Sequence, residues 1–101
     1  MTTVYVSIGN SDDKLTQADW AIFRSSVDQV IRRASDQVHG AWVSPSVDPW
    51  QNACWCFEIT GITSTWLRDQ LQNLALAYQQ DSIAWAVAET EFISGEEVGG
   101  K

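Results

Sequence analysis

Along this chain the apolar residues switch between two spacings. Apolar residues at every second position are typical of a half-buried strand, and apolar residues at every third or fourth position are typical of an amphipathic helix. Tested in this way, the chain predicts the order strand, helix, strand, strand, helix, strand. The predicted segments are residues 3–8, 17–34, 38–43, 53–59, 65–79 and 83–88, the last continuing towards Phe92.

This order, with a hairpin between the two middle strands, predicts the α+β class and the ferredoxin-like βαββαβ arrangement. The expected sheet has four antiparallel strands in the order 4-1-3-2, with two helices on one face. At the level of fold, residues 3–92 look like ferredoxin-like small domains. That fold carries many unrelated functions, so the resemblance implies no activity. We expect one domain over residues 1–93 and a flexible C-terminal tail over residues 94–101, which hold three glycines and no periodic apolar pattern.

The two predicted central strands each have a core face and an uncovered face. In the first strand Val4, Val6 and Ile8 alternate with Tyr5 and Ser7. In the third strand the two faces carry different chemistry, because side chains at alternate positions point to opposite sides of a sheet. The core face should carry Trp55, Phe57 and Ile59, and the uncovered face should carry Cys54, Cys56 and Glu58.

Local signals refine the ends of the elements. Thr16 suits the N-cap of the first helix, with Asp19 three residues later. Gly61, followed by a run of Thr and Ser residues, breaks the strand pattern, so we expect the second helix to begin near Thr65. The strand over residues 38–43 is weaker because Gly40 suggests a bulge or a close backbone approach, which favours an edge position.

The predicted topology brings three loops to one end of the sheet, which we call the rim. These loops are residues 9–15, 44–52 and 79–82, and Lys14 is the one cation among their polar residues. Loops on a rigid scaffold often carry binding residues, and a tryptophan among amides and carboxylates is typical of a contact surface. The candidate partner-binding residues are Asn10, Asp12, Asp13, Asp48, Trp50, Gln51, Asn52, Gln80 and Asp81.

The charge of the chain limits its partners. Thirteen acidic residues against six basic ones give a formal net charge of -7. Nucleic acids and anionic membranes are bound through basic patches, so direct binding to either is disfavoured. No apolar run reaches the ~18 residues that span a bilayer, and the first residues do not resemble a signal peptide. We therefore expect a cytoplasmic protein whose partner has a basic or polar surface.

The sequence offers little chemistry for catalysis, and we expect no catalytic residue, metal or cofactor. His39 is the single histidine, on a predicted edge strand away from the rim. Cys54 and Cys56 have no basic neighbour in sequence that would activate a thiol, and a C-x-C pair with one distant histidine lacks the ligand pairs of zinc sites. The rim aspartates offer oxygen ligands for Mg²⁺ or Ca²⁺, but without calcium-loop spacing.

Two functional hypotheses follow. The first is a small acidic, non-enzymatic interaction module, an inhibitor or adaptor, which docks its tryptophan-containing rim on a basic surface, for example by blocking a nucleic-acid-binding protein. The alternative is a dimeric ligand-binding or enzymatic module with a pocket on the uncovered sheet face. Tyr5, Cys54 and Cys56 would line that pocket, with Ala84, Ala86 and Ala88 if these point outward.

Overall fold

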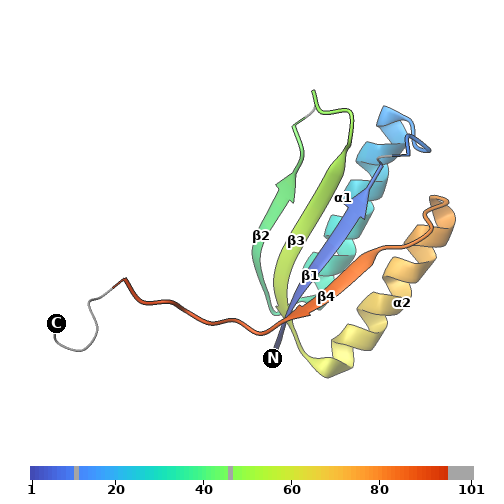
Figure 1. Cartoon of the computed structure of the whole chain (residues 1–101). Coiled ribbons are helices and arrows are strands. Elements are labelled where there is room, and N and C mark those ends of the chain that lie inside the picture. The colour runs from blue at the N-terminus through green and yellow to red at the C-terminus, as the bar shows by residue number, and fades with distance from the viewer. Residues whose placement is uncertain (11, 46, 96–101) are drawn as a thin grey trace.

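The computed structural model describes residues 1–10, 12–45 and 47–95. The elements are β1 (Thr2–Gly9), α1 (Gln17–Ala34), β2 (Gln37–Val43), β3 (Asn52–Ile59), α2 (Gly61–Ala77) and β4 (Ala84–Ala88). The strands form one antiparallel sheet in the order β2-β3-β1-β4, and both helices cover the same face (Figure 1). The predicted ferredoxin-like α+β fold is therefore confirmed.

The strand register assigns every sheet residue to a face. At the middle of the sheet Tyr5 pairs with Cys56 on β3 and with Ala86 on β4. Residues paired across antiparallel strands point to the same side, so Ala84, Ala86 and Ala88 all lie on the face that no helix covers, which we call the open face. Cys54, Cys56 and Glu58 share it, as their alternation predicted.

The core lies between the sheet and the helices. Trp55, Phe57 and Ile59 are at most 2% exposed, as predicted from their shared face. The indole Nε1 of Trp55 donates a hydrogen bond to Asp28 Oδ1 at 2.9 Å, so burial leaves no unpaired donor on this ring. The other buried apolar residues of the core are Val4, Val6, Ile8, Leu15, Trp20, Phe23, Val27, Ile31, Ala34, Ala53, Leu67 and Leu71.

Strand β2 contains the bulge that its glycine suggested. The pairing with β3 shifts between Val38 and Gly40, which leaves His39 as the extra residue. A Cβ atom on Gly40 would lie 2.7 Å from the ring of Trp42, closer than such contacts allow. Glycine is therefore required for the indole to lie over the backbone of β2.

The helix starts follow local hydrogen bonds. Helix α1 begins after Thr16, whose Oγ1 accepts a hydrogen bond from the Asp19 amide at 3.1 Å, as predicted. Helix α2 begins at Gly61, so the prediction of a start near Thr65 was wrong. Thr60 has extended backbone angles, and its carbonyl accepts from the Ser64 amide at 3.0 Å and from the Thr63 hydroxyl at 3.3 Å, which starts the helix earlier.

The C-terminal strand is shorter than the sequence suggested. β4 ends at Ala88, so its predicted continuation towards Phe92 was wrong. Ala88 pairs with Thr3, and β1 begins at Thr2, so the neighbouring strand ends here and offers no further backbone partner. Residues 89–95 leave the sheet as an extended segment (Figure 1). Of the predicted tail, residues 96–101 lie outside the described part of the chain.

Over the described residues, neither helix has the combination of length and apolar character that crossing a membrane requires.

Candidate functional site

The rim is organised around Asn10, which is only 1% exposed. Its side-chain amide donates to the Leu15 carbonyl and to Gln51 Oε1, both at 3.0 Å, and its Oδ1 accepts from the Leu15 amide at 3.0 Å. Its backbone amide donates to the Gln51 carbonyl at 2.8 Å. Asn10 therefore closes its own loop and fastens that loop to the β2–β3 hairpin, so its contribution to the rim is made from inside.

Gln51 continues this network towards α1. Its Nε2 donates to Gln17 Oε1 at 2.6 Å, and the Gln17 amide returns a hydrogen bond to Gln51 Oε1 at 3.1 Å. The hairpin is thus held against the first turn of the helix. Because Gln51 is only half-buried, part of its surface still faces solvent.

Lys14 connects the first loop to the turn between α2 and β4. Its Nζ lies 3.5 Å from a carboxylate oxygen of Asp12 and 3.5 Å from one of Asp81. Asp13, next to Lys14, has a φ of 59°, a left-handed conformation that Asp tolerates better than most residues. The three loops meet at one end of the sheet (Figure 1), as the topology predicted.

The hairpin carries the apolar part of the rim. Trp50 is 66% exposed and Val47 is 88% exposed. Asn52 Nδ2 donates to the Trp50 carbonyl at 3.3 Å, and the Asn52 amide donates to Ser44 Oγ at 3.0 Å, so the base of this loop is fixed while the indole faces solvent. Figure 1 shows this hairpin projecting beyond the other two loops.

The predicted site residues thus divide into two groups. Asn10 and Gln51 hold the loops together, and Gln80 bonds within its own turn, its Nε2 donating to the Tyr78 carbonyl at 3.1 Å. The exposed group, which we call the rim surface, consists of Asp12, Asp13, Asp48, Trp50 and Asp81, with Asn52 exposed at the base of the hairpin. Partner binding by this surface stays a prediction.

A metal site was one alternative for the rim aspartates. Within the described residues no three His, Cys, Asp or Glu side chains gather closely enough to hold an ion. The position between Asp12 and Asp81 is taken by the ammonium group of Lys14, which supplies the positive charge there.

Sequence reasoning missed a second polar cluster, on the open face. Glu58 Oε2 accepts a hydrogen bond from Thr3 Oγ1 at 2.5 Å and lies 2.8 Å from His39 Nε2. The hydrogen bond from Thr3, and then that from His39, hold the pKa of Glu58 below its usual value of 4.5, against the opposing effect of burial. The bulge in β2 places His39 beside Glu58, and its signal in the sequence was Gly40.

Two other polar features complete the open face. The side-chain hydrogen bond with Cys56 raises the pKa of Tyr5 above its usual value of 10.0. A shallow groove of about 610 Å³ runs over Tyr5, Cys56 and the Glu58 cluster and is bordered by Phe92. This arrangement has hydrogen-bonding groups and aromatic rings.

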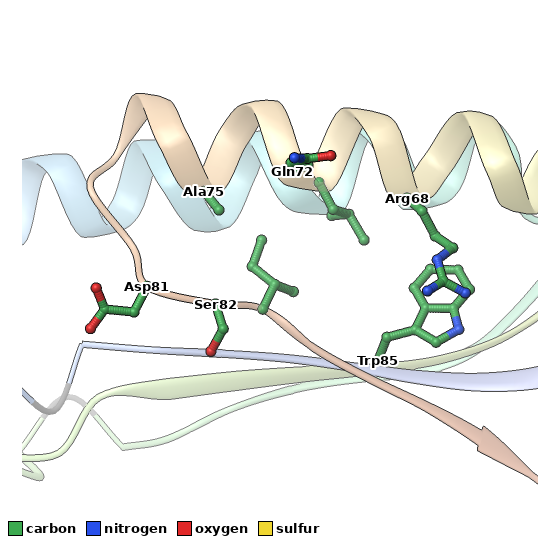
Figure 2. A pocket seen from close by; sticks show the side chains of 8 residues that line it. Arg68, Gln72, Ala75, Asp81, Ser82 and Trp85 are labelled. Carbon is green, nitrogen blue, oxygen red and sulfur yellow. The ribbon is translucent and has the colours of Figure 1, made fainter.

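A smaller groove of about 290 Å³ lies between α2 and β4. Figure 2 shows the Arg68 guanidinium stacked over Trp85, where its Cζ lies 5.2 Å from the ring centroid, while the Asp81 and Ser82 side chains point away from the helix. The polar groups do not converge on one point. The groove therefore lacks the set of aligned polar contacts that fixes a small ligand.

Fold and rim together define this chain as a small ferredoxin-like α+β module. No family model matches the chain, and no curated protein matches it. Among solved structures, the chain is similar to the C-terminal domain of the MgtC protein from Mycobacterium tuberculosis, with a TM-score of 0.60 and 15% sequence identity over 88% of this chain and 89% of that one. At this identity the similarity shows the fold alone.

A second solved structure is described as a dimeric ferredoxin-like protein from an uncultured marine organism. It aligns with a TM-score of 0.41 and 14% identity over 94% of this chain and 95% of that one.

Proposed function

We propose that this chain is a non-enzymatic protein-interaction module that docks its rim surface on a basic partner. The observation that carries the proposal is the exposure of Trp50, at 66%, on the same end of the sheet as four aspartates. Tryptophan is enriched among the residues that dominate binding energy, and its truncation in an interface costs ~2 kcal/mol or more.

The charges of the rim suit a cationic partner. Asp12, Asp13, Asp48 and Asp81 face one cation, Lys14, which is paired with two of them. Complementary charge speeds association and selects among partners more than it adds affinity. A basic protein surface, such as one that binds nucleic acid, meets this requirement, and a protein that covers it acts as an inhibitor of that binding or as an adaptor.

The internal hydrogen bonds of the rim support the same function. Because Asn10, Gln17 and Gln51 fix the loops before any partner arrives, less conformational entropy is lost on binding. A preformed surface of this kind suits docking of a folded partner better than capture of a flexible substrate.

The proposal is tested by affinity capture from the native host with the tagged chain. We expect a stoichiometric basic protein whose retention falls with rising salt, and which is lost in Trp50→Ala and in Asp13→Lys. Two matched controls alter the same residue types elsewhere: Trp66→Ala on α2, where Trp66 is 37% exposed, and Asp36→Lys at the opposite end of the sheet. Equal retention by the rim variants and the controls would contradict the proposal.

A further inference from the structure

The open face of the sheet has a raised side and a flat side. From β2 to β4 the register gives one row of Trp42, Cys54, Ser7 and Ala84, and the next row of Gly40, Cys56, Tyr5 and Ala86. On β2 the large side chains of Trp42 and His39 form a ridge, whereas β4 presents three alanines, which form a floor. The surface therefore steps down across its width.

This face is also nearly free of net charge. In the four strands, all described, the ionisable acid and base groups other than Tyr5 and the two cysteines are Glu58 and His39, which contact each other at 2.8 Å. The chain as a whole carries -7, so its acidic groups lie on the helices, loops and terminal segment. Two copies would repel one another least through this face.

An extended segment borders the open face at the end away from the rim. Residues 89–95 leave β4 and run past the ends of the other strands (Figure 1), and Thr90 and Phe92 border the groove there. Phe92 is 93% exposed and Ile93 is 94% exposed. Adjacent large apolar side chains on a segment that leaves the body mark a surface used for contact.

We propose that the open face and this segment form the interface of a homodimer. A two-fold axis that runs along the strands, between the two facing sheets, places the β2 ridge of each copy over the β4 floor of the other. Such an interface is self-complementary, as two-fold symmetry requires. Tyr5 lies near the axis and faces Cys56 of the second copy across the ~10 Å that separates packed sheets.

The dimensions of the face indicate that the terminal segment takes part. Four strands at ~4.8 Å spacing and about six residues of ~3.3 Å each give a face of roughly 400 Å². Stable interfaces bury ~800 Å² on each partner. The remainder has to come from the segment, since a buried aromatic side chain alone contributes ~150–250 Å². Phe92 and Ile93 therefore wrap around the second copy.

The test is sedimentation equilibrium of the full chain over a wide concentration range, with Ala86→Arg and Phe92→Ser. Ala86 and Phe92 are both exposed in the single copy, so neither change disturbs the monomer fold. We expect a dimeric wild type, a dissociation constant at least ~100-fold higher for Ala86→Arg, because two arginines are buried per dimer, and a smaller rise for Phe92→Ser. Ala21→Arg, at an exposed position of α1, is the matched control and should remain dimeric.

A wild type that is monomeric at all concentrations overturns the proposal, and so does a dimer that Ala86→Arg leaves intact. The inference is independent of the proposed function, because it uses a different face of the molecule. A failed capture with the rim surface leaves the sedimentation result unchanged, and the reverse also holds.

Discussion

The imidazole Nε2 of His39 lies 2.8 Å from Glu58 Oε2, across the pairing of β2 with β3, and Thr3 on β1 donates to the same carboxylate oxygen. One carboxylate thus connects three neighbouring strands on the open face. It lies at the end of the sheet away from the rim, so both ends of the sheet are held by side-chain hydrogen bonds.

This carboxylate predicts a pH dependence of stability. The pKa of Glu58 is lowered in the folded chain, so ionised Glu58 favours folding above its unfolded pKa of about 4.5, and this contribution is lost as the pH falls through the lower folded value. We expect Glu58→Gln to be less stable than wild type at pH 6, with the difference shrinking below pH ~4.5. Urea unfolding at several pH values measures it. A difference that is constant with pH, or equal to that of Glu89→Gln outside the strands, would contradict the assignment.

Asn10 predicts the largest effect of a polar truncation in the rim. Asn10→Ala removes the partners of the Leu15 amide and carbonyl and one contact to Gln51. Leaving buried groups unpaired costs ~1–3 kcal/mol each in the free energy of unfolding, and we expect a total of ~3 kcal/mol. Chemical denaturation measures the loss. The exposed Asn52→Ala serves as the control and should cost less than ~1 kcal/mol.

The two tryptophans of residues 50–55 should respond in opposite ways. Trp55 is 2% exposed and bonds to Asp28, so Trp55→Ala should lower the free energy of unfolding by ~3–5 kcal/mol. Trp50 is 66% exposed, so Trp50→Ala should change it by less than ~0.5 kcal/mol. Thermal and urea unfolding of both variants give the comparison, and a mild effect at Trp55 would mean that the faces of β3 are reversed.

Gly40 and Trp42 should be energetically coupled. In Gly40→Ala the new methyl group meets the indole, which has to swing away from the strand. We expect a loss of ~1 kcal/mol, which is absent when the same change is made in Trp42→Ala. A double-mutant cycle by urea unfolding measures the coupling. If the two changes are additive, the ring does not lie over Gly40 in solution.

The hydrophobic pattern was sufficient to predict the strand order, the core face of β3 and the meeting of three loops at one end, because each follows from side-chain period and chain direction. It did not predict that Asn10 is buried. An asparagine after a strand is equally suited to an exposed turn, and its partners, Leu15 and Gln51, are brought to it only by tertiary packing. Likewise, the pairing of His39 with Glu58 depends on one extra residue in β2, which changes the register without changing composition.

The burial of Asn10 has a consequence for how this chain tolerates change. Because one inward amide and its hydrogen bonds fix the course of the loops, the outward positions at Asp12, Asp13 and Asp48 carry little of the folding energy. Substitutions there can alter which surfaces the molecule recognises while the loop backbone stays where it is. The rim is therefore a natural acceptor for grafted recognition residues, with Asn10 as the position that has to be kept.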